Sequence, residues 1–217
     1  MTIKACVFDM DGTLLNTLDD LATSANTVLR QHGFDPHPVE AYRTFVGSGV
    51  RNLIIRALPE NARNEATIDA CLAAFKIHYD THWADQTHLY EGLTDTLDQL
   101  TKQGLKLAIL TNKPQPFADL CVDKFLGRWT WNIVQGQQDG LPIKPDAAVS
   151  QKVTDALEVS PAEVLYFGDS DVDMFTARNA GYRAIGVSWG FRSIDELNQA
   201  GAEQIIHQPH ELLNLLN

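Results

Sequence analysis

The sequence contains no uninterrupted apolar run of the roughly eighteen residues that a membrane-spanning helix needs. Basic residues are scarce too, with 17 lysines and arginines against 28 aspartates and glutamates and a formal net charge of −11. This balance disfavours non-specific nucleic-acid binding, because that binding depends on neutralising phosphates with Lys and Arg. It still permits a small anionic substrate, since the local field of a site can oppose the net charge. We therefore expect neither nucleic acid nor membrane among the partners.

Cysteine is also rare. Cys6, Cys71 and Cys121 lie far apart, their number is odd, and no Cys-x-x-Cys occurs. The sequence therefore predicts neither a disulfide framework nor a cysteine zinc site. Residues 1–9 lack the long apolar stretch of a signal peptide, and reduced thiols suit a reducing compartment, so we expect a cytoplasmic protein.

Short apolar runs alternate with helical patterns through the second part of the chain. Strands are predicted at residues 3–9, 105–110, 132–134, 164–167, 184–187 and 204–206. Helical spacing between the later strands is typical of parallel βαβ units. We therefore expect an α/β protein with a Rossmann-like, three-layer core of parallel sheet and helices, formed by residues 1–15 and 86–217. Residues 16–85 show mainly helical spacing and are predicted to form an inserted helical domain.

The first helix expected in the insertion starts near Thr17 and ends before Gly33 and Pro36. Apolar residues recur at helical spacing from residue 18 to residue 29. Thr17 and Asp20 have the spacing of a capping box, although Asp is a weaker partner than Glu there. We expect these two side chains to cap the N-terminus of the helix.

Four polar segments fall at or just after the ends of predicted strands. They are Asp9-Met-Asp11-Gly-Thr, Thr111-Asn112-Lys113, Lys144-Pro145-Asp146 and Gly168-Asp169-Ser-Asp-Val-Asp173. The loops that follow successive parallel strands converge at one edge of a sheet. The four segments are therefore predicted to form one site.

Carboxylates dominate this predicted site. Asp9 and Asp11 are two apart in an extended segment, so they point to one side and repel unless a cation bridges them or one is protonated. Asp169 and Asp173 are four apart at a helix start and share a face. Taken singly, the first pair also fits an acidic turn and the second fits helix capping. Four carboxylates at one edge call for a hard cation with oxygen ligands, and Mg²⁺ is the natural one.

Lys144 and Thr111 are candidates for binding the substrate. A lysine beside a carboxylate–metal cluster suits an anionic substrate, as does a hydroxyl beside free backbone N–H groups. Each residue alone also fits a simpler interpretation, a solvated loop lysine or a helix cap. The ordered set of all four segments favours function over these alternatives.

The four segments, in this order, resemble the four motifs of the haloacid dehalogenase superfamily, and within it the phosphoglycolate-phosphatase-like group. The resemblance extends from Val7 to Gly181, and the first motif is highly specific. It implies that Asp9 is the nucleophile that takes up the phosphoryl group as an aspartyl-phosphate. Asp11 would protonate the leaving oxygen and then activate the hydrolytic water.

The same resemblance implies the remaining roles. Thr111 and the backbone of Asn112 would hold phosphoryl oxygens, and Lys144 would neutralise Asp9 and the transferring group. Mg²⁺ would be held by Asp9, Asp169 and the backbone carbonyl of Asp11. The side chain of Asp173 would ligate it directly or through water.

Asp11 also narrows the chemistry, because the dehalogenase branch of the superfamily lacks an aspartate at this position. The resemblance therefore implies a Mg²⁺-dependent phosphatase acting on phosphoglycolate or a similar small phosphorylated metabolite, as a monomer or homodimer. A sugar phosphomutase of the same superfamily is the alternative. A catalytically silent binding protein on this fold is a third hypothesis, and the intact Asp9, Asp11, Lys144 and Asp169 argue against it.

Within the insertion, Phe45-Val46-Gly47-Ser48-Gly49-Val50-Arg51 resembles the cap loop that meets the leaving group in this group of enzymes. Gly47 and Gly49 at a helix start would offer free N–H groups to an anion, and Arg51 adds a bidentate donor. A helix-start turn with a solvated arginine explains the segment equally well. His78 and His82 are four apart with His88 nearby, and we interpret them as surface or hinge residues rather than zinc ligands.

Overall fold

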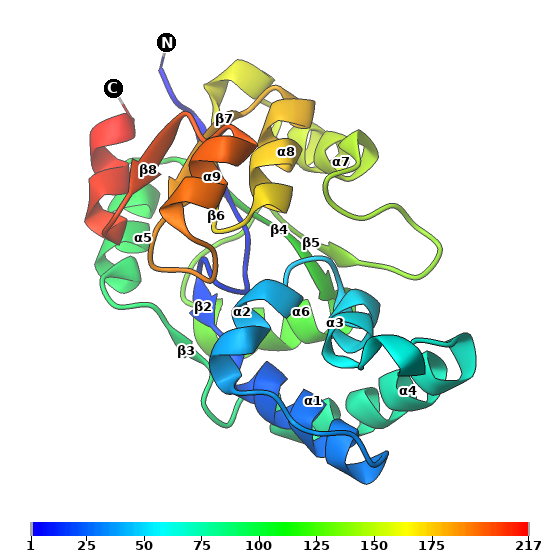
Figure 1. Cartoon of the computed structure of the whole chain (residues 1–217). Helices are drawn as coiled ribbons and strands as arrows, with labels where there is room; N and C mark the ends of the chain where they lie inside the picture. Colours follow the sequence, from blue (N-terminus) through cyan, green and yellow to red (C-terminus); the bar gives the residue numbers. More distant parts are fainter. Residues whose placement is uncertain (1, 217) are drawn as a thin grey trace. The chain divides into compact units, whose positions relative to one another are not determined.

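The computed structural model describes residues 2–216. Contacts divide the chain into two compact units, one formed by residues 1–15 and 89–217 and the other by residues 16–88. The first unit contains the main sheet and the second is helical (Figure 1). The helical unit ends at residue 88, where the sequence analysis expected residue 85.

A six-stranded parallel sheet forms the centre of the first unit and confirms the predicted α/β class. Its strands, in spatial order, are β5 (Ile133–Gln137), β4 (Lys106–Pro114), β1 (Ala5–Phe8), β6 (Val164–Gly168), β7 (Arg183–Val187) and β8 (Gln204–Ile206). Every residue of β1 is buried. The chain builds β4 and β5 on one side of β1 and then β6, β7 and β8 on the other, so the end of β1 is a topological switch point, where open α/β sheets bind ligands.

Helices cover both faces of this sheet. They are α5 (Leu93–Lys102), α6 (Gln115–Cys121), α7 (Ala147–Leu157), α8 (Asp171–Ala180) and α9 (Ile194–Ala200). Residues of α7, α8 and α9 form one apolar cluster with β1, β4 and β6, while α6 packs on β4 and β5 from the other face. A 3-10 helix, Pro209–Leu215, follows β8 near the C-terminus.

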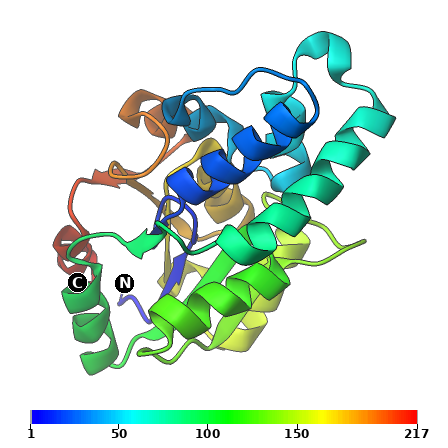
Figure 2. The ribbon, with the colours of Figure 1, turned by 90° about the horizontal axis from the view of Figure 1, so that it is seen from below.

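The helical unit contains α1 (Leu18–Gln31), α2 (Tyr42–Phe45), α3 (Val50–Ala57) and α4 (Glu65–His82). Helix α1 packs along α4, and α3 contacts both α2 and α4 (Figure 2). Strands β2 (Leu15–Asn16) and β3 (His88–Leu89) pair where the chain passes between the units. Elements of two residues carry no periodicity, so the sequence analysis did not predict them.

The predicted capping box at the start of α1 is wrong. Thr17 makes no capping hydrogen bond with its side chain. The Asp20 carboxylate instead accepts hydrogen bonds from the backbone N–H groups of Gln86 and Thr87 and from the Thr87 hydroxyl. Three donors from a distant segment outcompete one weak local partner, and a sequence window around Thr17 contains none of them.

Strand β4 is longer than predicted. It continues past Leu110 to Pro114 and includes Thr111, Asn112 and Lys113, which were expected at its end or in the following loop. The pairing register with β5 shifts between Leu110 and Pro114. Gly136 on β5 permits this close approach, because a Cβ there would lie 2.9 Å from the Lys113 carbonyl oxygen.

Candidate active site

The predicted polar residues of the α/β unit lie at the carboxyl ends of three neighbouring strands. Asp9 directly follows β1, and Asp169 directly follows β6. Thr111 lies near the end of β4, and Asp173 lies in the first turn of α8. Lys144 reaches the same place from the segment between β5 and α7.

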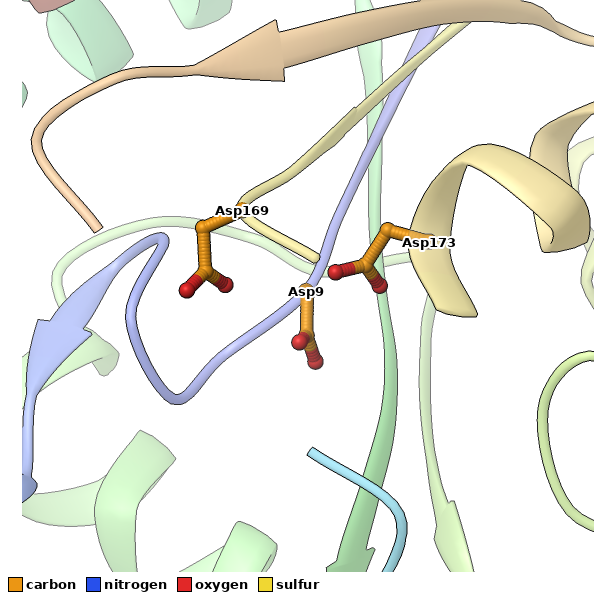
Figure 3. A group of neighbouring side chains, drawn as sticks. All are labelled: Asp9, Asp169 and Asp173. Atoms are coloured by element: carbon orange, nitrogen blue, oxygen red, sulfur yellow. The ribbon is translucent and has the colours of Figure 1, made fainter. Parts of the chain in front are cut away.

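Three of the predicted carboxylates converge, as Figure 3 shows. One oxygen from each of Asp9, Asp169 and Asp173 lies within 4.8 Å of the others, and all three residues are buried. Burial, the nearby Asp173 carboxylate and Asp11 together raise the pKa of Asp9 to about 7, although Lys144 opposes the shift. Burial, followed by Asp173 and Asp9, also raises the pKa of Asp169 well above its usual range.

Lys144 is the cation of this cluster. Its Nζ lies 2.9 Å from Asp9 Oδ1 and 2.7 Å from Asp173 Oδ1, and the residue is only 3% exposed. Burial alone would lower the pKa of Lys144, but Asp173 and Asp9 outweigh it and raise the pKa. Asn112 fixes the backbone of this lysine, since its amide donates to the Lys144 carbonyl and accepts from the Lys144 N–H at 2.9 Å.

The charge balance of the cluster fits a divalent metal ion. Three carboxylates are buried together with one ammonium, which pairs with Asp9 and Asp173, so ionising all three leaves two uncompensated negative charges. Carboxylate oxygens are the ligands that Mg²⁺ prefers. A bound divalent cation would compensate the excess charge and oppose both the burial and the repulsion that raise the pKa values of Asp9 and Asp169.

Two glycines leave room for the Asp169 carboxylate. A Cβ at Gly12 would lie 2.3 Å from Asp169 Oδ2, and one at Gly190 would lie 2.2 Å from the Asp169 Cβ. Gly12 also has a φ of +86°, which side chains disfavour. The Thr13 hydroxyl and the Phe191 N–H orient the Asp169 carboxylate by donating to its two oxygens.

Asp173 fits both interpretations of its position in the sequence, helix capping and membership of the carboxylate site. Its Oδ2 accepts hydrogen bonds from the N–H and the hydroxyl of Ser170, which caps the start of α8. Its Oδ1 accepts from Lys144 and from the Tyr166 hydroxyl. The residue is therefore a helix cap and a member of the buried charge cluster at once.

The side chain of Asp11 lies outside the group of three converging carboxylates. Its Oδ1 pairs instead with Lys113 Nζ at 3.0 Å, and both side chains are largely buried. The hydroxyl of Thr111 accepts a hydrogen bond from the Lys113 N–H. Lys113 was quoted in the sequence analysis without a role, and its pairing with Asp11 adds a second buried ammonium to this edge of the sheet.

The predicted cap-loop residues lie in the helical unit. Gly47 and Gly49 both have positive φ, and Gly49 directly precedes α3. The guanidinium of Arg51 pairs with Glu65 and Asp69 of α4. Arg56, which the sequence analysis passed over, donates to the Phe45 carbonyl and the Ser48 hydroxyl and so braces the loop.

Each of the three histidines considered as zinc ligands has a hydrogen-bond partner. His78 contacts the Ser24 hydroxyl, His82 contacts the Asp85 carboxylate, and His88 contacts the Gln86 carbonyl. Across residues 2–216, Asp9, Asp169 and Asp173 are the group whose ligand atoms lie close enough together to hold a metal ion. Within that range, the structure shows no helix with both the length and the apolarity needed to cross a membrane.

The sequence is similar to a known family of hydrolases and to several named phosphatases. The sequence model of the haloacid dehalogenase-like hydrolase family matches residues 6–187. Phosphoglycolate phosphatase 1 of Pseudomonas aeruginosa is 33% identical over 217 residues, covering 97% of this chain and 78% of the relative. The phosphoglycolate phosphatase of Chromobacterium violaceum is 32% identical, covering 99% of this chain and 96% of the relative.

The fold has close structural counterparts. The crystal structure of a protein from Lactobacillus delbrueckii subsp. bulgaricus superposes with a TM-score of 0.92 at 29% sequence identity. The superposition covers 100% of this chain and 99% of the other.

Proposed function

The chain belongs to the haloacid dehalogenase-like hydrolase family, and we propose that it is a Mg²⁺-dependent phosphatase working through an aspartyl-phosphate on Asp9. The similarity to phosphoglycolate phosphatases identifies it as a phosphoric monoester hydrolase. Phosphoglycolate or a metabolite of similar size is the proposed substrate, because relatives of 32–35% identity carry the name phosphoglycolate phosphatase.

One observation carries the proposal: Asp9, Lys144, Asp169 and Asp173 are buried together at the carboxyl edge of the sheet. Burying three carboxylates around one lysine destabilises a fold, because each buried charge needs a partner. A cluster that costs stability in this way is typical of a functional site.

In the proposed reaction, an oxygen of Asp9 attacks the phosphorus of the ester. The bond from phosphorus to the leaving oxygen breaks, and Asp11 gives that oxygen a proton. Water then attacks the phosphorus of the aspartyl-phosphate and passes a proton to Asp11. The Asp9–phosphorus bond breaks, and inorganic phosphate and the original carboxylate are regenerated.

Lys144 and the carboxylates would prepare this site for an anion. Mg²⁺, when bound, supplies the positive charge that lets an ionised Asp9 approach a negative phosphoryl group. Asp9, Asp169 and the backbone carbonyl of Asp11 would hold it. We place Asp173 behind a water molecule, because its two oxygens already accept four hydrogen bonds from Lys144, Tyr166 and Ser170.

The remaining predicted residues would bind the rest of the substrate. Thr111 and the Asn112 backbone would hold phosphoryl oxygens at the end of β4. The helical unit would act as the cap that selects the substrate, with Gly47 and Gly49 presenting backbone N–H groups. Arg51 would take part only if it exchanged Glu65 or Asp69 for an anionic substrate group.

A phosphate-release screen over several dozen phosphorylated metabolites, with and without Mg²⁺, tests the proposal. We expect Mg²⁺-dependent release from phosphoglycolate or a related small ester. Conversion of a hexose phosphate with little net release would favour the phosphomutase, and no turnover of any ester would favour the silent binding protein. Excess Ca²⁺ should inhibit, because its looser coordination misplaces the nucleophile. Full activity after exhaustive chelation would contradict the metal requirement.

A further inference from the structure

Tyr166 is a buried tyrosine that the proposed reaction does not use. It lies on β6 opposite Val7 of β1, and Val7 pairs on its other side with Ala108 of β4. The Tyr166 side chain belongs to the apolar cluster on the face that α7 and α8 cover. Its hydroxyl reaches the Leu110 carbonyl oxygen on β4 at 3.2 Å. The side chain therefore passes across β1, the strand that leads to Asp9, and links β6 to β4.

The hydroxyl ends among the charged groups of the site. It lies 3.1 Å from Lys144 Nζ and 3.1 Å from Asp173 Oδ1. The hydroxyl oxygen can accept from the ammonium while its proton goes to Asp173 or to Leu110. Tyr166 has no exposed surface, so its hydroxyl can reach a substrate only through these neighbours.

The ammonium of Lys144 has three N–H groups and three oxygen neighbours. These are Asp173 Oδ1 at 2.7 Å, Asp9 Oδ1 at 2.9 Å and the Tyr166 hydroxyl at 3.1 Å. A lysine ammonium stands on a flexible four-carbon stem, so two partners alone leave it free to rotate and shift. The third oxygen completes a tripod that fixes the direction of the ammonium.

We propose that Tyr166 is a positioning residue for Lys144 and, through it, for Asp9. The inference rests on the proposed function only in taking Asp9 as the nucleophile. Without the hydroxyl, one buried N–H of Lys144 lacks an acceptor, and the ammonium can settle on Asp173, its closer carboxylate partner. Asp9 Oδ1 then keeps the Met10 N–H at 2.7 Å but loses the ammonium that also orients it, and the chemical step slows.

The chain offers a matched control in Tyr182. This residue is also buried, lies in the same apolar cluster and stacks on Tyr166 with ring centroids 6.4 Å apart. Its hydroxyl bonds to the Thr154 hydroxyl and the Ser150 carbonyl. Tyr182→Phe therefore removes a buried, hydrogen-bonded hydroxyl from the same core while leaving the neighbours of Lys144 unchanged.

The test compares Tyr166→Phe and Tyr182→Phe with the wild type at saturating Mg²⁺ on the ester that the wild type hydrolyses best. We expect Tyr166→Phe to lower kcat about tenfold or more, since sub-ångström misplacement of a reacting group is costly. Its KM should stay within about twofold, because the hydroxyl does not contact substrate. Tyr182→Phe should keep the wild-type kcat while losing a similar amount of thermal stability.

A second measurement does not depend on turnover. NMR of the ¹⁵N-labelled protein detects lysine ammonium groups whose protons exchange slowly with water, and the buried Lys144 qualifies. Tyr166→Phe should broaden or shift this signal, and Tyr182→Phe should not. Equal kcat in the two variants, or a loss confined to KM, would overturn the inference, as would an unchanged Lys144 signal. A wild type that hydrolyses no ester would overturn the proposed function instead, and the NMR result alone would then decide the role of Tyr166.

Discussion

Buried aspartates occur in both units of this protein, and the groups that surround their carboxylates differ. In the helical unit, Asp20 is 2% exposed, and its carboxylate accepts from two backbone N–H groups and one hydroxyl. In the α/β unit, Asp9 and Asp173 share the ammonium of Lys144, and an oxygen of Asp169 lies within 4.8 Å of an oxygen of each. Burial itself therefore does not mark a functional acid. The distinguishing property is the balance between like charges and the donors available to each carboxylate.

The two environments have different energetic consequences. The donors of Asp20 tie the segment before β3 to α1, so this carboxylate stabilises the helical unit. In the cluster around Asp9, burial and then repulsion between carboxylates raise the pKa of Asp9 and of Asp169. Removing a charge should therefore have opposite effects on stability in the two places.

Asp9→Asn should show the largest effect on activity. Losing the attacking carboxylate oxygen should lower turnover by about ten-thousandfold or more. The free energy of unfolding should stay the same or rise, because a repulsive buried charge disappears. Phosphate release and thermal unfolding measure the two quantities. Release near the wild-type rate would show that Asp9 is not the nucleophile.

Asp20→Ala should show the opposite pattern. It removes the acceptor of the two buried Thr87 donors and of the part-buried Gln86 N–H, while the Thr87 hydroxyl keeps the Trp83 carbonyl oxygen. We expect a loss of about 2 kcal/mol in unfolding free energy. Asp20→Asn retains one acceptor oxygen and should lose less. Affinity for Mg²⁺, measured by calorimetry, should not change in either variant. An unfolding free energy equal to that of the wild type would remove the contrast between the two environments.

The pH dependence of stability follows from the raised pKa of Asp9. Between about pH 4 and pH 7, the folded metal-free protein keeps a proton that the unfolded chain has lost, so stability falls as the pH rises through this window. Asp169 shifts in the same direction. Mg²⁺ needs ionised ligands, so it should raise the Tm more at about pH 8 than at about pH 5. Asp9→Asn should flatten this dependence, whereas equal Mg²⁺ shifts at both pH values in the wild type would contradict it.

Arg51→Ala should show the smallest effect. Its carboxylate partners Glu65 and Asp69 are exposed, and exposed ion pairs change equilibria by less than about fivefold. We expect a small and equal change in kcat/KM on a carboxylate-bearing ester and on an aryl phosphate without a second anion. A much larger loss on the carboxylate-bearing ester would instead assign Arg51 to substrate recognition.

Features that depend on residues close together in the chain could be predicted from the sequence, and features that depend on distant residues could not. Parallel strands and helices were located because apolar periodicity depends on adjacent residues. The capping box at Thr17 failed because Asp20 bonds to residues 86 and 87. Tyr166 lies within the strand predicted at residues 164–167, and nothing in the neighbouring sequence distinguishes its hydroxyl from that of Tyr182.

The sequence by itself determined which chemical groups follow each strand and in what order, and from these the parallel α/β class could be predicted. Only the tertiary structure decided how the groups share partners: Lys144 among Asp9, Asp173 and Tyr166, Lys113 with Asp11, and Asp20 with Thr87. The physical reason is distance along the chain. Periodicity is encoded within one turn or strand, whereas each of these hydrogen bonds and ion pairs joins segments that meet only after the units have folded.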